Sequence, residues 1–394
     1  MVGRTTLSRS SQLAALAARM ADGGANLTVE TPDGDAIAIG EDPTRARVVF
    51  HSNGAVGALL DGSHLELAEA YLREELDVEG ELRQALFVTD HLDLNRPSWL
   101  RRALVSLRFA FDRRRLNRRS IAYHYDRPPE FFLAWLDPSR SYTHGMFATP
   151  DEDLGTAQRR KLQFAIDALD LRAGMQVLDM GCGWGSFLEY AGAQGIRVHG
   201  ITLSRDQHAF VSELIRAKRL PCSVECVDFL DYRPAEAFDG AVFMGSLEHM
   251  PDYGYLGRFL ARHLTPEARV YSDFVTTREG RLAGAFLRKY IFPGVSGYVE
   301  LGKLVTALVA AGFDVRELGD DTSSCAHTVR DWARTMERVR VELAARHGEL
   351  AVRAFLLYLW SSHHFLETGR TQAYHLIVDR RRGSPGFAQT LGRR

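Results

Sequence analysis

The larger, C-terminal part of the chain alternates short apolar runs with polar segments of helical length. This alternation, which begins near residue 126, is typical of βαβ units, in which helices cover a sheet of buried strands. It predicts an α/β domain over residues 126–394 with a mostly parallel sheet. The expected strands are Gln176–Asp179, Arg197–Ile201, Ser223–Val227, Gly240–Met244 and Arg269–Phe274.

A different pattern occupies residues 1–95. Three short strand-like runs, Asn26–Glu30, Ala36–Ile39 and Arg47–Phe50, are separated by glycine-containing turns, and a helical pattern follows from His64 to Leu76. This order predicts a small α+β domain in front of the α/β domain.

A strongly basic segment, predicted as a linker helix over residues 96–125, joins the two domains. Its apolar residues fall near helical spacing and leave a basic face. Such a face can bind anionic lipid or can simply be solvated, and both interpretations stay open. Nucleic acid is not expected as a partner because base-stacking motifs are absent nearby. The basic residues are Arg101, Arg102, Arg108, Arg113, Arg114, Arg115, Arg118 and Arg119.

Composition narrows the class of protein. The 394 residues are 45% hydrophobic and 25% charged, which excludes fibrous and disordered chains. The four cysteines show neither metal-ligand spacing nor a secreted framework, so we expect no metal and a cytoplasmic location. No apolar run is long enough to span a bilayer and no signal peptide is evident, so at most we expect peripheral binding to the inner face of the membrane.

The most informative motif runs from Val177 to Ser186, where an apolar strand ends in an acid and three alternating glycines. Glycines at a strand–helix turn let a nucleotide-like ligand approach the backbone. A dinucleotide site would need glycine at Ser186 and an acid closing the next strand, which instead continues into Thr202. The motif resembles the S-adenosylmethionine loop of Rossmann-like class I methyltransferases, although a purely structural glycine turn is the alternative.

Further motifs, taken in order, resemble the cyclopropane-fatty-acyl-phospholipid synthase and mycolic acid cyclopropane synthase family. The likeness extends over nearly the whole chain, and the N-terminal domain resembles the lipid-associated module of the bacterial phospholipid enzymes. The matching motifs are Gly62-Ser63-His64, Ala68-Glu69-Ala70-Tyr71, His124-Tyr125-Asp126, Phe131-Phe132, Leu136-Asp137-Pro138-Ser139, Ser141-Tyr142-Thr143-His144-Gly145-Met146-Phe147, Gly200-Ile201-Thr202-Leu203-Ser204 with Gln207, Leu247-Glu248-His249 and Lys289-Tyr290-Ile291-Phe292-Pro293.

The resemblance implies a set of residues that bind S-adenosylmethionine. Glycines admit the cofactor's amino-acid end, and Thr202 and Gln207 can hydrogen-bond ribose or carboxylate. Tyr232 stands where the family places an aromatic beside adenine, with Asp228 or Asp231 as further candidates, and core packing is the alternative for the tyrosines. The implied set is Tyr142, Thr143, Asp179, Gly181, Gly183, Gly185, Thr202, Gln207, Tyr232 and Met244.

The resemblance also implies Glu248 and Tyr358 as catalytic residues, with His249 more often a structural side chain. The family usually has cysteine at His144 and histidine at Asp273, around a bicarbonate ion that accepts a proton. A further carboxylate would repel that anion unless Asp273 is protonated or paired, so bicarbonate is in doubt. Our hypothesis is that Asp273 faces His144 and makes it an internal base.

Together these observations predict an S-adenosylmethionine-dependent enzyme that adds a methyl or methylene group to the double bond of an unsaturated acyl chain, with phospholipid as the expected carrier. The expected product is a cyclopropane or a methyl- or methylene-branched chain. The alternatives are a small-molecule C-methyltransferase of the same fold and a non-catalytic lipid-binding relative. Product type, double-bond position, head group and a homodimeric state stay open.

Overall fold

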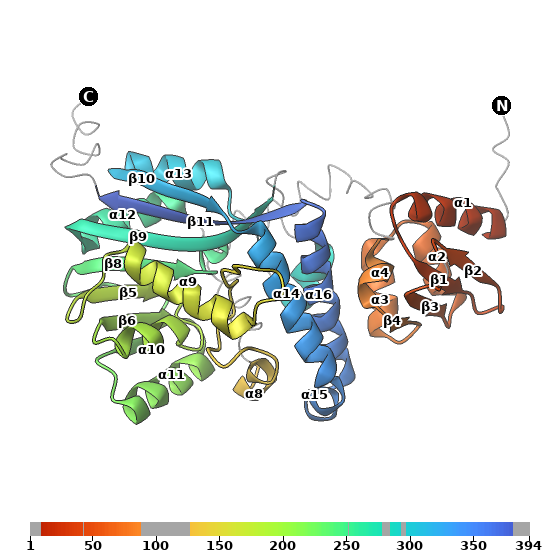
Figure 1. The fold of residues 1–394 in the computed structure, drawn as a ribbon, viewed down its shortest axis with the longest axis horizontal. Helices are drawn as coiled ribbons and strands as arrows, with labels where there is room; N and C mark the ends of the chain where they lie inside the picture. Colours follow the sequence, from red (N-terminus) through yellow and green to blue (C-terminus); the bar gives the residue numbers. More distant parts are fainter. Residues whose placement is uncertain are drawn as a thin grey trace. The chain divides into compact units, whose positions relative to one another are not determined.

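The computed structural model describes residues 9–41, 43–87, 127–250, 252–277, 284–292 and 297–380, which belong to two compact units (Figure 1). The first unit combines the N-terminal 110 residues with residues 340–364, and the second contains the rest of the chain. The predicted basic linker and the motif His124-Tyr125-Asp126 lie outside the described residues.

The second unit is built on a seven-stranded sheet of order β10-β11-β9-β8-β5-β6-β7. Neighbouring strands from β7 to β9 are parallel, and β11 is antiparallel to both β9 and β10. This mostly parallel sheet confirms the predicted α/β class and all five predicted strands; β10 and β11 were not predicted. The strands are β5 (Gln176–Met180), β6 (Arg197–Thr202), β7 (Ser223–Cys226), β8 (Phe238–Met244), β9 (Leu264–Thr277), β10 (Phe313–Asp320) and β11 (Thr371–Arg380).

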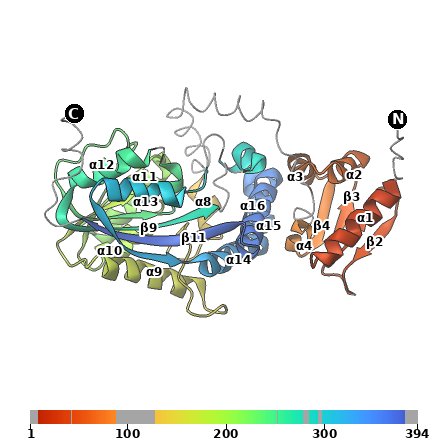
Figure 2. The ribbon, with the colours of Figure 1, turned by 90° about the horizontal axis from the view of Figure 1, so that it is seen from above.

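Helices cover both faces of this sheet (Figure 2). One face packs against α9, α10 and α11, and the other packs against α12 and α13, each through a buried apolar cluster. Because the central strands β5 and β8 are buried on both faces, the connecting helices can cover both sides of the sheet. The helices are α8 (Pro129–Leu133), α9 (Leu154–Ala168), α10 (Ser186–Gly192), α11 (Arg205–Lys218), α12 (Tyr253–His263), α13 (Leu301–Ala310) and α14 (Thr322–Arg338), with short turns η1 (Leu247–His249) and η2 (Leu287–Ile291).

The first unit contains a four-stranded sheet of order β2-β1-β3-β4. The three predicted strands are present, but the predicted helix from His64 ends at Leu72, because the chain reverses through Glu74 (φ 60°) and Leu76 begins β4. The elements are α1 (Arg9–Asp22), β1 (Leu27–Glu30), β2 (Ala36–Ile39), β3 (Ala46–Phe50), α2 (Asn53–Leu60), α3 (His64–Leu72), β4 (Leu76–Gly80), α4 (Leu82–Leu86) and α15 (Arg340–His347), together with most of α16 (Glu349–Glu367).

A buried arginine ties α16 to the N-terminal sheet within this first unit. Arg353 is only 4% exposed and donates hydrogen bonds to the carbonyl oxygens of Tyr71 (2.7 Å) and Leu76 (3.0 Å) and to Asp77 Oδ1 (2.7 Å). Its guanidinium also lies 4.0 Å from the centroid of the Tyr71 ring. These contacts explain why residues 340–364 group with the N-terminal segment although in sequence they lie between two elements of the second unit, α14 and β11.

None of the described helices has both the length and the apolarity needed to cross a membrane. Within the same residues, no cluster of histidine, cysteine and acidic side chains has the makings of a metal site.

Candidate active site

The glycine loop follows β5 directly. Gly181 (φ +91°) and Gly183 (φ +52°) both have left-handed backbone conformations that favour glycine. A Cβ at Gly181 would lie 2.8 Å from Ser246 Cβ, whereas a Cβ at Gly183 would meet no atom within 4 Å. The loop therefore turns tightly against the residues after β8 and leaves open space beside Gly183.

That open space is part of a cavity of about 1170 Å³, its open mouth included, at the carboxyl ends of β5, β6 and β8. β5 lies between β6 and β8, where the strand order reverses, which is the usual ligand position in open α/β sheets. The lining includes the predicted residues Tyr142, Thr143, Asp179, Gly181, Gly183, Thr202, Gln207 and Met244, and also Arg140, Trp184, Asp228, Phe229, Leu230, Ser246, His249 and Met250.

Two predicted cofactor residues are placed elsewhere. Tyr232 belongs to the hydrophobic core, where its ring stacks on His199 (5.5 Å between centroids) and burial raises its pKa to about 12. The chain turns at Asp228, whose carbonyl accepts from the Tyr232 backbone N–H, so Phe229 and Leu230 line the cavity instead. Gly185 does not line the cavity either; a Cβ there would lie 3.1 Å from Val211 in α11.

The polar wall of the cavity is partly preorganised. The Thr202 hydroxyl donates to Gln207 Oε1 (2.7 Å), and Ser204 caps α11 by accepting from the Gln207 backbone N–H. The Gln207 amide group thus keeps its N–H donors for a ligand. Ser246 Oγ is buried and has no hydrogen-bond partner among the described residues. A bound molecule with polar groups would satisfy these atoms.

Two residues that line the cavity, His249 and Asp179, have pKa values shifted by burial. Burial lowers the pKa of His249 to about 4, so its imidazole is neutral near pH 7. Burial raises the pKa of Asp179 to about 7, against the opposing effect of Lys161. The sequence motif identified Asp179, but nothing in it indicated that His249 faces the cavity.

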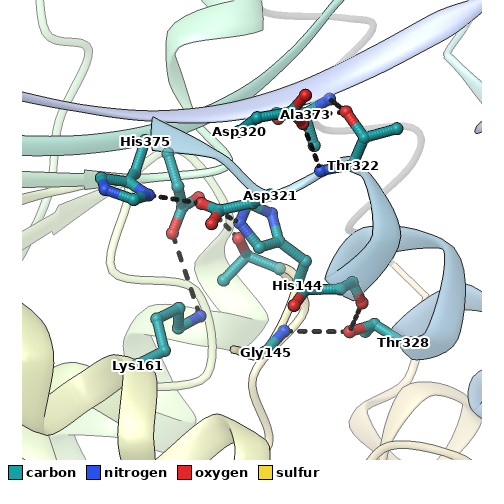
Figure 3. A network of polar contacts seen from close by, with 12 residues as sticks. His144, Gly145, Lys161, Asp320, Asp321, Thr322, Thr328, Ala373 and His375 are labelled. Carbon is teal, nitrogen blue, oxygen red and sulfur yellow. Dashed lines mark hydrogen bonds and ion pairs between the residues drawn. The ribbon is translucent and has the colours of Figure 1, made fainter. Parts of the chain in front are cut away.

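The predicted pairing of His144 with Asp273 is wrong. His144 Nε2 lies 3.1 Å from Asp321 Oδ2, and His375 Nδ1 lies 2.7 Å from the same oxygen (Figure 3). Burial alone would lower the pKa of His144, but hydrogen bonds to Asp321 and Cys325 and the nearby charge of Asp273 raise it to about 10. His144 is therefore already protonated at neutral pH and cannot serve there as a base.

Asp273 finds other partners. Its Oδ1 atom accepts from the Thr143 hydroxyl (2.6 Å) and from the Gly245 backbone N–H (2.8 Å). Its Oδ2 atom lies 3.4 Å from the Tyr271 hydroxyl and 4.0 Å from Lys161 Nζ. Asp273 and Lys161 are both 0% exposed. Lys161 belongs to a helix far from β9 in sequence, so no local pattern could indicate this pair.

Glu248 lies in η1, four residues beyond the end of β8. Its Oε1 atom accepts from the Val275 backbone N–H (2.8 Å), and its Oε2 atom is buried with no hydrogen-bond partner in the described part of the chain. Burial raises its pKa to about 7, and Asp273 acts in the same direction. Glu248 is thus a carboxylate that can exchange a proton near neutral pH.

Tyr358, the other residue implied as catalytic, lies on α16 in the first unit, with its ring 6.2 Å from that of Phe355. Its catalytic role stays a prediction.

Comparisons with known proteins give consistent results. The family model "Mycolic acid cyclopropane synthetase" matches residues 112–376, and a domain of unknown function (DUF7884) matches residues 20–90. A "Probable fatty acid methyltransferase" from Pseudomonas putida is 27% identical over 88% of this chain and 90% of its own length. "Sphingolipid C9-methyltransferase A" from Emericella nidulans is 30% identical over 68% of this chain, which spans only about half (52%) of that relative.

Among solved structures, the cyclopropane synthase MmaA2 from Mycobacterium tuberculosis superposes with a TM-score of 0.62 and 24% identity, covering 67% of this chain and 98% of that one. Mycolic acid cyclopropane synthase CmaA1 complexed with SAH and CTAB gives a TM-score of 0.63 and 23% identity with the same coverage. At these identities the two structures establish a shared class I methyltransferase fold.

Proposed function

Because this chain belongs to the mycolic acid cyclopropane synthetase family, we propose that it transfers a methyl group from S-adenosylmethionine to the double bond of an unsaturated acyl chain. The proposed product is a cyclopropane or a methyl- or methylene-branched chain, and the proposed carrier is a phospholipid. The relative from Pseudomonas putida, named a probable fatty acid methyltransferase, supports this substrate class because its alignment spans 88% of the chain.

The cavity residues fit S-adenosylmethionine. The open space beside Gly183 admits a ligand against the backbone, and the apolar side chains of Phe229 and Leu230 suit a flat base. At the glycine loop, the guanidinium of Arg140 lies at the cavity wall and donates to the Trp184 carbonyl (3.4 Å). Its ion-pair partner Glu189 also pairs with Lys218, so the three groups together keep a net positive charge. This charge suits the carboxylate of the cofactor's amino-acid end.

When bound, the cofactor supplies an electrophilic methyl group on its sulfonium. In the proposed reaction the π electrons of the alkene form the new C–C bond, the S–CH3 bond breaks, and the acyl chain carries a positive charge. The single observation that carries the proposal is Glu248, a carboxylate with a raised pKa whose buried Oε2 atom has no hydrogen-bond partner among the described residues. Glu248 does not itself line the cofactor cavity, but it directly precedes His249, which does. Its negative charge stabilises the cation, and it accepts the proton whose loss yields the neutral product.

A bicarbonate ion, which the family resemblance suggests as the base, is a further candidate. Asp273, whose charge would repel the anion, is partly neutralised by Lys161. Product formation in carbonate-depleted buffer with and without added bicarbonate distinguishes the two routes. Strong stimulation of product formation by bicarbonate would show that bicarbonate accepts the proton. Glu248 would then have the role of holding the bicarbonate ion.

Mass spectrometry of lipids tests the proposed activity. A bacterial host expressing the chain is grown on methionine with a deuterated methyl group, and its total lipids are compared with those of a host expressing Glu248→Gln. We expect labelled acyl chains only with the unmodified protein. A cyclopropane and a methylene branch have each lost one deuterium, whereas a methyl branch beside a retained double bond keeps all three. Binding of S-adenosylhomocysteine without any labelled lipid would favour a non-catalytic or small-molecule role.

We also propose that the protein works in the cytoplasm at the inner face of the membrane, held by its basic segment. The sequence supports this through Arg113, Arg114 and Arg115, since each basic residue near an anionic surface contributes about 1 kcal/mol. Replacing all three with glutamine should reduce sedimentation with phosphatidylglycerol vesicles, and salt should have the same effect. Equal sedimentation of the unmodified protein and the triple variant would indicate that the basic segment is a solvated linker.

A further inference from the structure

Lys161 is an unusual residue for the interior of this protein. It lies on α9 (Figure 3), is 0% exposed, and its Nζ atom makes an ion pair but has no hydrogen-bond partner among the described residues. A buried ammonium group is costly unless a counter-charge compensates it. Its nearest carboxylate is that of Asp273, with 4.0 Å between Nζ and Oδ2. Neither residue lines the cofactor cavity.

Asp273 joins two segments that do line the cavity. Through Oδ1 it accepts from the hydroxyl of Thr143, in the loop before α9, and from the backbone N–H of Gly245, in the loop after β8. These segments are close together, because a Cβ at Gly245 would lie only 3.3 Å from Thr143 Cβ. One carboxylate oxygen therefore fixes two neighbouring parts of the cavity wall.

Helix α9 contributes a second contact to the same wall. Gln158 is located three residues before Lys161 on α9, so both side chains fall on one face of the helix. Gln158 Nε2 donates to the Thr143 carbonyl oxygen (2.6 Å). The helix therefore holds the backbone of Thr143 directly and the side chain of Thr143 through Asp273.

The Asp273 carboxylate can hold Thr143 and Gly245 only while a nearby positive charge compensates its own charge. Asp179 and Glu248 are close enough to Asp273 for its charge to raise their pKa values. Without Lys161 the buried carboxylate would face these acids, and among the described residues only the imidazolium of His144, which makes no ion pair with it, would offset them. A buried carboxylate in such surroundings takes up a proton, which removes part of its capacity to accept hydrogen bonds.

We propose that the Lys161–Asp273 pair is a positioning device for the cofactor: Lys161 supplies the counter-charge, and Asp273 Oδ1 holds Thr143 and Gly245 in the geometry that binds S-adenosylmethionine. This inference rests on the cofactor site proposed above. It also changes the expected role of Asp273, which acts through the cavity wall and not as part of the base.

The experiment compares two charge-neutral double variants of the full chain. In Lys161→Met with Asp273→Asn, the amide oxygen still accepts from Thr143 and Gly245. In Lys161→Met with Asp273→Leu, that acceptor is gone. Binding of S-adenosylhomocysteine is measured by calorimetry, and thermal unfolding verifies that each variant is folded.

We expect the asparagine double variant to bind within about threefold of the unmodified protein. The leucine double variant should bind at least about tenfold more weakly, because the two half-buried donors of Thr143 and Gly245 lose their acceptor and the cavity wall loses its link. The single variant Lys161→Met should bind more weakly than the asparagine double variant. Equal dissociation constants for the two double variants would overturn the inference and leave the pair a purely structural role. Failure of the unmodified protein to bind would instead refute the proposed cofactor site.

Discussion

Among single residues, Glu248 carries the proposed proton transfer. Its pKa is raised to about 7, chiefly by burial, so the carboxylate form needed for a base is lost as the pH falls below that value. We therefore expect kcat/KM to rise with pH through an ionisation near 7. Glu248→Gln should reduce turnover by about 10²- to 10⁴-fold, the usual contribution of a general base, and leave cofactor affinity nearly unchanged.

The matched control is Glu225→Gln, which removes an exposed carboxylate on β7. The measurement is a pH–rate profile with an unsaturated phospholipid. A Glu248→Gln enzyme with the original profile would exclude this residue as the base.

A substitution of the single residue Gly183 tests whether the glycine loop belongs to the cofactor site. A valine there would need a left-handed backbone and would place its side chain in the open space that the cofactor requires, so Gly183→Val should abolish S-adenosylmethionine binding. Gly174→Val is the control, because Gly174 also has a positive φ (+88°) and open space around it but lies away from the cavity. Calorimetry separates the two; equal affinity in both variants would remove the glycine loop from the cofactor site.

At the scale of elements, the first turns of α14 hold the loop that carries Tyr142 and Thr143. As Figure 3 shows, Asp321, just before α14, pairs with His144, and Thr328 accepts from the backbone N–H of Gly145. Ser324 likewise accepts from the backbone N–H of Phe147 (3.0 Å). Because the partners are more than 170 residues apart in sequence, this docking forms only when the second unit folds.

The Asp321 contacts make stability depend on pH. Hydrogen bonding raises the pKa of His144 from 6.5 to about 10 despite its burial. A raised folded-state pKa stabilises the protein fully below about pH 6.5, and this contribution disappears as the pH rises toward 10. Asp321→Asn should therefore lower the free energy of unfolding by about 1–3 kcal/mol at pH 6, and by less at pH 10.

Denaturant unfolding at the two pH values measures this effect. Thr328→Val is the control, because it removes a hydrogen bond without a titratable group and should cost a similar amount at both. If the difference between Asp321→Asn and the unmodified protein does not change with pH, His144 is not held as a cation by Asp321.

At the scale of the whole molecule, the chain passes from the second unit into the first at residue 340 and returns after residue 364. The hydrogen bonds of Arg353 connect residues 340–364 to the N-terminal sheet. Arg353→Met should remove three hydrogen bonds and a cation–π contact and destabilise the first unit by about 3 kcal/mol.

Hydrogen exchange is the suitable measurement, since a protein with two units need not unfold in one step. Exchange should accelerate in α16 and β4 and stay unchanged in β5 and β8. Arg346→Met, which breaks an exposed pair with Glu342, should change neither region. Faster exchange in β5 and β8 as well would contradict the independence of the first unit.

The sequence by itself determined the features that depend on short stretches of chain. Apolar runs located the five mutually parallel strands of the second unit, β5 to β9, and the glycine motif located the cavity through Gly181 and Gly183. Thr202 and Gln207 were implied by the family resemblance, and both line the cavity because β6 ends beside β5 and α11 begins just after β6. Glu248 was found only through the family resemblance, since a single acid after a strand has no local signature of catalysis.

The tertiary structure alone decided which charged groups face one another. His144 pairs with Asp321 across 177 residues, and Lys161 reaches Asp273 from another element, where local periodicity carries no information about partners. Tyr232 turned into the core because of a backbone turn at Asp228, and residues 340–364 joined the first unit through Arg353. The physical reason is the same in each case: burial makes an unpaired polar group costly, and only the complete packing arrangement determines which distant group can pair with it.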